Sequence, residues 1–150
     1  MIAEHLDQVL EIERVSFPSP WERSAFLNEI YNNNYAYYYV CLVEGKVCGY
    51  AGLWLILDEV HITNIAVHPH WRGRGLGKLL LDFLLHEAAR LGADRVTLEV
   101  RVSNIAAQKL YERAGFTRAG VRKGYYNDTR EDAIIMWKHL YGPELGGEEW

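Results

Sequence analysis

Apolar residues recur at helical spacing near the start of the chain, and two short helices are predicted there. The first covers about residues 3–15, and its apolar positions are Leu6, Val9, Leu10 and Ile12. The second covers about residues 22–31 and ends at Asn32–Asn34, a typical helix stop. Between them, the proline-bounded stretch Phe17–Trp21 predicts a stiff loop whose apolar ends pack down.

Alternating residues with high strand propensity follow, and they predict strands at about residues 35–43, 46–57 and 59–67. Glu44-Gly45 is typical of a two-residue hairpin turn between the first two strands. Such a turn places Cys41 directly opposite Cys48. We expect two reduced thiols, as in a reducing cytosol; a disulfide is the alternative.

The second half of the chain alternates helices and strands. A helix over about residues 76–91 is apolar on most of its faces, which predicts deep burial, and Gly92 is well placed to terminate it. The remaining elements are a strand at about 95–101, a helix at about 105–113 with Asn104 as its N-cap, and strands at about 117–125 and 130–139 around the turn Asn127-Asp128. The pattern predicts one mixed α/β domain over residues 1–140 and an acidic, glycine-rich tail over residues 141–150 that frays.

Composition narrows the class of protein. The chain has 150 residues, of which 49% are hydrophobic and 24% charged, as in ordinary globular domains. No apolar run reaches the ~18–20 residues that a membrane span needs, and the acidic N-terminus is unlike a secretory signal. We therefore expect a cytoplasmic protein without a membrane partner. The net charge of -4 argues against nucleic acid as a partner.

The run from Asn64 to Lys78 carries the most specific pattern. A short apolar strand stops at Pro69, and a glycine-rich turn with two arginines then opens a helix. Because the first N–H groups of a helix have no internal partner, this turn predicts a phosphate site. The Walker and dinucleotide patterns both fail, since Leu79 and Lys78 occupy positions that they reserve for other residues. The pattern [RQ]-x-x-G-x-[GA] fits, with its fixed positions at Arg72, Gly75 and Gly77.

That loop resembles the pyrophosphate loop of the GNAT superfamily of acyl-CoA N-acyltransferases. Further motifs are L-E-V-R-V-S-N (Leu98–Asn104), L-Y-E-R-A-G-F (Leu110–Phe116) and Y-Y-N-D-T-R-E-D-A-I-I-M (Tyr125–Met136). Together with F-P-S-P-W and N-I-A-V, these motifs resemble those of the RimI family. The resemblance covers about residues 3–138. Those enzymes acetylate the N-terminal alanine of small-subunit ribosomal protein number eighteen. The resemblance implies a GNAT fold, with a mostly antiparallel sheet flanked by helices, and acetyl-CoA as the donor.

One departure concerns the start of the fold. The family opens with a strand before the first helix, and only Met1-Ile2 precede that helix here. We expect this first strand to be very short or missing. The predicted strand at 35–43 then becomes an edge of the sheet.

Acetyl transfer to an amine needs a proton acceptor, and Glu99 is the candidate. It stands alone among apolar neighbours in V-T-L-E-V, so desolvation is expected to raise its pKa. The resemblance makes Glu99 the general base, acting directly or through water. The alternative is a carboxylate that merely pairs with Arg101 or Arg95.

The resemblance also assigns the remaining site. It makes Tyr111 the general acid that protonates the coenzyme A thiolate; a tyrosine packed at the core edge is the alternative. Backbone groups of Ile65, Ala66 and Val67 would receive the acetyl and pantetheine part. The other cofactor-binding positions are Arg72, Gly73, Arg74, Gly75, Leu76, Gly77 and Lys78 around the pyrophosphate, and Asn104, which its capping role alone would also explain.

The histidines predict no metal site. His68 and His70 form H-P-H, but no third ligand recurs at useful spacing, so we interpret them as loop residues. His61 is interpreted as an ordinary strand residue.

For the acceptor, the resemblance indicates the Phe17–Trp21 loop and the Tyr125–Asp132 hairpin as the sides of a peptide groove. Acidic residues would give the groove a rim for a basic N-terminal peptide of a ribosomal protein, and they are Glu13, Glu22, Asp128, Glu131 and Asp132. We expect a monomer or weak dimer. The alternatives are a GNAT enzyme for another amine (protein lysine, small metabolite or aminoglycoside), a non-catalytic acyl-CoA-binding module, and a nucleic-acid binder that uses the tyrosine-rich strand.

Overall fold

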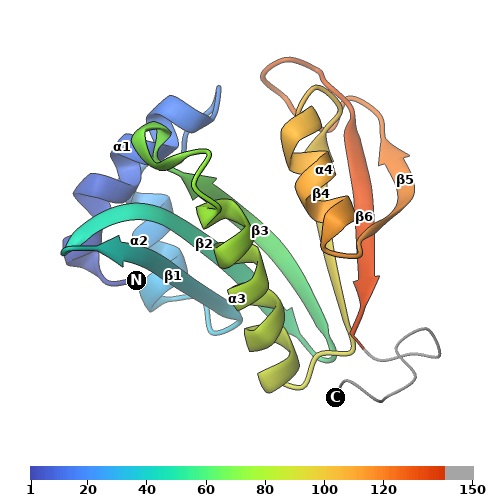
Figure 1. Ribbon diagram of the computed structural model, residues 1–150, viewed down its shortest axis with the longest axis horizontal. Coiled ribbons are helices and arrows are strands. Elements are labelled where there is room, and N and C mark those ends of the chain that lie inside the picture. Colours follow the sequence, from blue (N-terminus) through green and yellow to red (C-terminus); the bar gives the residue numbers. More distant parts are fainter. Residues whose placement is uncertain (141–150) are drawn as a thin grey trace. The chain divides into compact units, whose positions relative to one another are not determined.

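The computed structural model describes residues 1–140, and the predicted tail at 141–150 lies outside them. Its elements follow the predicted order (Figure 1). The helices are η1 (Ala3–His5), α1 (Leu6–Ser16), α2 (Arg23–Tyr31), η2 (Pro69–Trp71), α3 (Leu76–Arg90) and α4 (Ile105–Arg113), where η marks a 3-10 helix. The strands are β1 (Ala36–Val43), β2 (Lys46–Ile56), β3 (Glu59–Val67), β4 (Arg95–Arg101), β5 (Thr117–Arg122) and β6 (Ala133–His139).

The six strands are hydrogen-bonded in the order β1-β2-β3-β4-β6-β5. The pairs β1–β2, β4–β6 and β5–β6 are antiparallel and the pair β3–β4 is parallel, so the predicted mixed sheet is confirmed. Strand β1 is an edge, as expected, and the amino group of Met1 donates to the Tyr38 carbonyl oxygen at 2.8 Å. No strand precedes α1 in the described residues.

The chain divides into two units. The first comprises Met1–Trp54 and Ile62–Leu84, and the second comprises Leu55–His61 and the described residues from Leu85 onward. Strands β2 and β3 and helix α3 therefore contribute to both units. Within residues 1–140 no helix is both long and apolar enough to cross a membrane.

In the first unit, helices α1 and α2 bury their apolar faces with residues of β1, β2 and β3. Phe26 and Tyr50 meet edge to face with their ring centroids 5.8 Å apart. The carboxylate of Glu13 lies in this core and accepts hydrogen bonds from the Tyr50 hydroxyl and the Trp21 N–H. Because only 2% of Glu13 is exposed, its predicted place on an acidic rim is wrong.

The Tyr38 hydroxyl links β1 to β3 across β2. It lies 2.8 Å from Thr63 Oγ1 and donates to Asn64 Oδ1 at 2.8 Å, next to the segment Ile65–Val67. A Cβ at Gly52 would lie 2.3 Å from the Tyr38 ring. Glycine at that position of β2 therefore lets the ring pass, and the hydrogen bonds support β3 at the start of the predicted acetyl-binding segment.

The β1–β2 hairpin corrects the predicted cysteine register. Glu44 and Gly45 form the turn with φ of 51° and 80°, and Val43 pairs with Lys46 as predicted. A register shift then follows between Leu42 and Cys41, so that Cys41 pairs with Gly49 and not with Cys48. Both cysteines are free thiols with their sulfurs 3.3 Å apart.

Two other predictions differ from the structure. Strand β5 ends at Arg122 and β6 begins at Ala133, because residues 123–132 form a loop with left-handed backbone at Gly124 and Arg130. Helix α3 is buried on one face only, since Leu79 and Phe83 are 57% and 43% exposed. The long apolar pattern of α3 therefore overpredicted its burial.

Candidate active site

The glycine-rich turn lies in the first unit, between η2 and α3. Gly73 and Gly75 have φ of 77° and 80°, a region in which side chains are strained. The backbone freedom of these two glycines lets the chain turn sharply into α3. The first hydrogen bond of that helix runs from the Leu79 N–H to the Gly75 carbonyl. The N–H groups of the first helical turn thus have no partner within the helix and can serve an anion.

The basic side chains of this turn have protein partners. Arg72 donates from Nε to the Val67 carbonyl and from Nη2 to Ser16 Oγ, both at 3.0 Å. The Arg74 guanidinium lies 5.0 Å from the Trp71 ring centroid, and Lys78 Nζ lies 2.7 Å from Asp82 Oδ2. These contacts shape the turn, and the backbone N–H groups at the start of α3 are its further donors for an anion.

The strand before the turn is anchored to β2. The His68 N–H donates to the Cys48 carbonyl at 2.8 Å, at the end of Ile65–Val67. A Cβ at Gly49 would lie only 3.0 Å from the Ala66 carbonyl oxygen and 2.9 Å from Leu80 Cδ1. Glycine at this position lets β2 approach β3 closely, which fixes the path of the predicted acetyl-binding segment.

In the second unit, Glu99 lies at the centre of a small polar cluster. Its Oε1 lies 2.9 Å from His61 Nε2 and accepts a hydrogen bond of 3.2 Å from the Tyr125 hydroxyl. The Glu99 side chain is 11% exposed. The alternative partners are engaged elsewhere, since Arg101 pairs with Asp128 and Arg95 with Glu59.

These contacts reverse the expected pKa shift. Burial acts to raise the pKa of Glu99, but the His61 hydrogen bond and charge, the Tyr125 hydrogen bond and the charge of Arg122 together outweigh it. The pKa of Glu99 therefore lies below its ordinary value, and the prediction of a raised pKa was wrong. Glu99 is an ionised carboxylate throughout the neutral pH range.

Tyr111 and Asn104 belong to α4 in the same unit. The Tyr111 ring is buried against Phe116, with the centroids 5.8 Å apart, and burial raises the pKa of its phenol. This tyrosine keeps its proton at neutral pH. Asn104 caps α4 as predicted, because its Oδ1 accepts from the Ala107 N–H at 3.1 Å.

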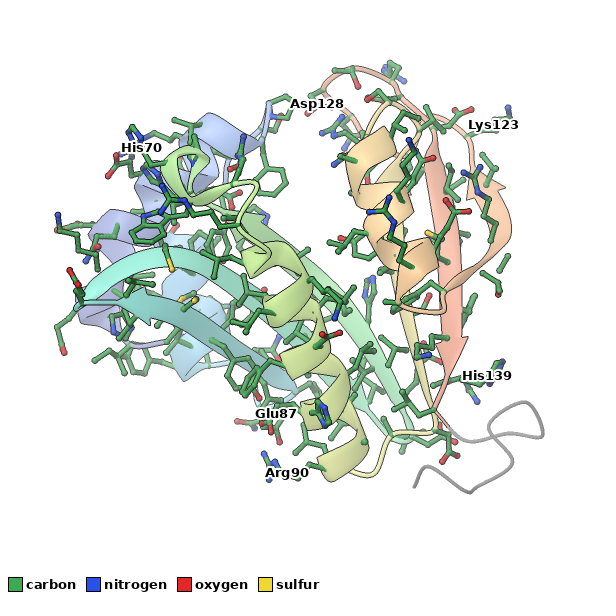
Figure 2. The ribbon with its side chains drawn as sticks, viewed as in Figure 1. His70, Glu87, Arg90, Lys123, Asp128 and His139 are labelled. Carbon is green, nitrogen blue, oxygen red and sulfur yellow. The ribbon has the colours of Figure 1, made fainter. Side chains whose placement is uncertain are left out.

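An arginine-centred cluster holds the loop between β5 and β6. The Arg101 guanidinium donates to both carboxylate oxygens of Asp128 at 2.7 and 3.1 Å, lies 3.5 Å from Glu131 and lies 4.0 Å from the Tyr126 ring centroid. Figure 2 labels Asp128 and Lys123 on this segment. Lys123 pairs with Asp132 at 3.2 Å. Asp128, Glu131 and Asp132 thus form ion pairs within this segment, and the acidic rim that includes them stays a prediction.

His61 and Tyr125 are the cluster members that sequence reasoning missed as partners of Glu99. His61 was interpreted as an ordinary strand residue, and Tyr125 only as part of a groove. The parallel pairing of His61 with Thr97 brings the histidine beside Glu99. The sequence holds no direct signal for this register, because nothing local to either strand encodes how β3 aligns with β4.

His68 and His70 stack with their ring centroids 5.0 Å apart, and His70 is labelled in Figure 2. His68 Nε2 lies 3.6 Å from Glu11 Oε1. Within residues 1–140 no three or more His, Cys, Asp or Glu side chains are grouped to hold a metal ion.

Comparison with known proteins finds matches over most of the chain. The model of the acetyltransferase (GNAT) family matches residues 6–116. A Bacillus subtilis protein provisionally named a [ribosomal protein bS18]-alanine N-acetyltransferase is 45% identical over 137 residues, 91% of each chain. The Escherichia coli K12 enzyme with that name is 40% identical over 87% of this chain and 88% of its own. A crystal structure of the Escherichia coli ribosomal-protein-S18-alanine N-acetyltransferase superposes with a TM-score of 0.85 at 35% identity, covering 95% of this chain and 92% of that one.

Proposed function

Because this chain belongs to the GNAT family of acetyltransferases, we propose that it transfers the acetyl group of acetyl-CoA to the N-terminal alanine of a small-subunit ribosomal protein. The observation that carries the proposal is the largely buried Glu99 carboxylate, which His61 and Tyr125 hold in place. The names of the Bacillus subtilis and Escherichia coli relatives support the choice of acceptor.

The donor is held by the first unit. Backbone N–H groups of the turn Gly73–Lys78 and the start of α3 bind the pyrophosphate, while Ile65–Val67 receives the acetyl and pantetheine part. Arg72 supports this arrangement from the side, since it joins the turn to Val67 and to α1 through Ser16. Asn104, at the start of α4 in the second unit, is the further cofactor-binding position that the family resemblance implies. The N–H groups of β3 stabilise the oxyanion that forms on the acetyl carbonyl.

Glu99 accepts the proton during attack. A free α-amine has a pKa of ~7.7–8.0, so its ammonium form does not readily protonate a carboxylate whose pKa lies lower than usual. The neutral amine therefore attacks the thioester carbon. As the C–N bond forms, the nitrogen becomes far more acidic and its proton passes to Glu99, directly or through water. The tetrahedral intermediate then expels the thiolate, and the acetyl–sulfur bond breaks.

Tyr111 completes the reaction by protonating the departing thiolate. The thiol of coenzyme A has a pKa of ~8.5, so protonation eases its departure at neutral pH. The raised pKa of Tyr111 keeps the phenol protonated until that step. As the products leave, Glu99 releases its proton to solvent and the Tyr111 phenolate takes one up, which restores both groups.

The Tyr111→Phe variant is expected to retain the fold and to lose ~10- to 100-fold in kcat. Only the hydroxyl is removed, and the ring still packs against Phe116. Steady-state kinetics measure the effect, with Tyr39→Phe as the matched control because the Tyr39 ring also packs against a phenylalanine, Phe83, with centroids 5.0 Å apart. Equal losses in the two variants would contradict the acid assignment.

The pH dependence follows from the low pKa of Glu99. A carboxyl whose pKa is depressed is already ionised above pH ~5, so it limits the rate only in more acidic solution. We expect log kcat/KM to rise with unit slope to the amine pKa of ~7.7–8.0 and to show no further bend between pH 5 and 7. A bend in that window would show that Glu99 is not the low-pKa base described here.

A peptide panel tests the acceptor class. Initial rates are compared for an alanine-initiated basic peptide, the same peptide with a blocked N-terminus and free lysines, and a polyamine. Turnover of the first alone supports the proposal. Turnover of the blocked peptide or the polyamine would indicate another amine as the substrate, and coenzyme A binding without turnover would indicate a binding module.

A further inference from the structure

We propose that Arg101 is a positioning residue that anchors the loop at residues 123–132 and thereby holds the Tyr125 hydroxyl on Glu99. Arg101 ends β4, two residues after Glu99, while Tyr125 belongs to the loop between β5 and β6. The inference rests on the proposed role of Glu99 and assigns Arg101 a role in the same reaction.

The Arg101 guanidinium contacts Asp128, Thr129 and Tyr126 of the loop at 123–132. Two parallel hydrogen bonds join its guanidinium to the Asp128 carboxylate, and a third, of 3.1 Å, reaches Thr129 Oγ1. Its guanidinium carbon also lies over the Tyr126 ring at 4.0 Å. The side chains of Arg101, Asp128 and Glu131 are only 15–17% exposed, so solvent screens these interactions weakly.

The loop is tied to its anchor at several places. The Ser103 N–H donates to Glu131 Oε2 at 2.7 Å, next to Arg101, and the Gly124 N–H donates to Asp132 Oδ1 at 2.8 Å. The Tyr126 N–H donates to the Glu131 carbonyl at 3.2 Å. These bonds fix the backbone on both sides of Tyr125, so its hydroxyl position depends on where Arg101 holds Asp128 and Glu131.

This arrangement also gives the loop's acidic residues a use. Their carboxylates accept the hydrogen bonds and ion pairs that hold the backbone on both sides of Tyr125. The rings of Tyr125 and Tyr126 meet edge to face with centroids 5.0 Å apart. Tyr126, which lies against Arg101, therefore supports Tyr125, whose hydroxyl donates to Glu99. Arg101 thus touches no reacting atom and acts on Glu99 through Tyr125.

Arg95 offers a matched control at the other end of β4. It also makes an ion pair, with Glu59 Oε1 at 3.3 Å, and its guanidinium carbon lies 5.7 Å from the Trp137 ring centroid. Within residues 1–140 its ion pairs are with Glu59 and Asp58, and they reach neither Glu99 nor the loop at 123–132. The Arg95→Met variant therefore measures the effect of removing an ion-paired arginine from β4 without disturbing the loop at 123–132.

Kinetics of Arg101→Met, Tyr125→Phe and the double variant test the route of action. We expect Arg101→Met to lower kcat/KM ~10-fold or more, with most of the loss in kcat. Because both changes remove the same hydrogen bond to Glu99, the double variant should be no slower than Arg101→Met alone. Both single variants should also shift the acid limb of the pH profile upward, and Arg101→Lys should recover part of the lost rate. Multiplicative losses, or an unchanged pH profile, would overturn the proposal.

Amide hydrogen exchange tests the anchor without any assay of activity. In Arg101→Met the amides of Gly124 and Tyr126 should exchange ~10-fold faster or more, and in Arg95→Met they should exchange as in the wild type. Unchanged exchange in Arg101→Met would overturn the anchor whatever the enzyme acetylates. If the wild type acetylates none of the peptides, the proposed function fails, and the exchange experiment still decides whether Arg101 holds the loop.

Discussion

Replacing Glu99 with glutamine is expected to lower kcat by ~100-fold or more and to leave the affinity for coenzyme A unchanged. Glutamine keeps the shape of the side chain and an oxygen that accepts hydrogen bonds from Tyr125 and His61. It removes the capacity to take up the proton of the attacking amine. Steady-state kinetics with both substrates and calorimetric titration with coenzyme A measure the two quantities separately.

The matched control for that experiment is Glu59→Gln. Glu59 also lies on a strand of the second unit and pairs with an arginine, Arg95, at 3.3 Å. Its amide variant should change kcat by no more than about twofold, as for a substitution away from the site. An unchanged rate in Glu99→Gln, or equal losses in both variants, would refute the assignment of Glu99 as the base.

Replacing Gly75 with alanine is expected to weaken coenzyme A binding by ~10-fold or more, through a KM effect for acetyl-CoA. Gly75 has φ of 80°, and alanine resists that conformation by ~1–2 kcal/mol. The backbone shift that relieves the strain turns N–H groups of the α3 start away from the pyrophosphate. Calorimetric titration with coenzyme A checks the affinity directly.

Gly92→Ala separates strain from binding. Gly92 ends α3 with φ of 88°, and at both glycines a Cβ would meet nothing within 4 Å. The two variants should therefore lose similar free energy of unfolding, while only Gly75→Ala loses affinity for coenzyme A. Equal affinities in the two variants would remove this turn from the donor site.

Much of the fold was predictable because its signals are local. Helical spacing, the turn at Glu44-Gly45 and the N-cap at Asn104 each depend on a few neighbouring residues, and the structure has all three. Left-handed backbone at Gly73 and Gly75 likewise follows from the residue type. The order of helices and strands, and with it the family resemblance, rests on such signals.

The features that were missed depend on long-range register. The pairing of His61 with Thr97 lowers the pKa of Glu99 by bringing the histidine to it, whereas burial alone predicted the opposite shift. The register shift beside Cys41 similarly moved one cysteine out of its predicted pairing. Strand patterns specify which face a residue takes but not its partner on the next strand.

Strands β5 and β6 are shorter than predicted because a tertiary contact acts on the segment between them. Residues 123–132 have no strong turn pair beyond Asn127-Asp128, so the alternating pattern extended both strands too far. In the structure Arg101 draws Asp128 and Glu131 to the end of β4, and this tertiary contact favours a loop over continued pairing. A side chain more than 20 positions away thus decides the local structure.

Mass spectrometry of an alanine-initiated basic peptide after incubation with acetyl-CoA and the protein tests the central claim most directly. The account predicts one acetyl group per peptide, located on the α-amine of the alanine by fragment ions, and its near-complete loss with Glu99→Gln. Acetyl groups found only on lysine side chains, or an unmodified peptide with intact acetyl-CoA, would contradict it.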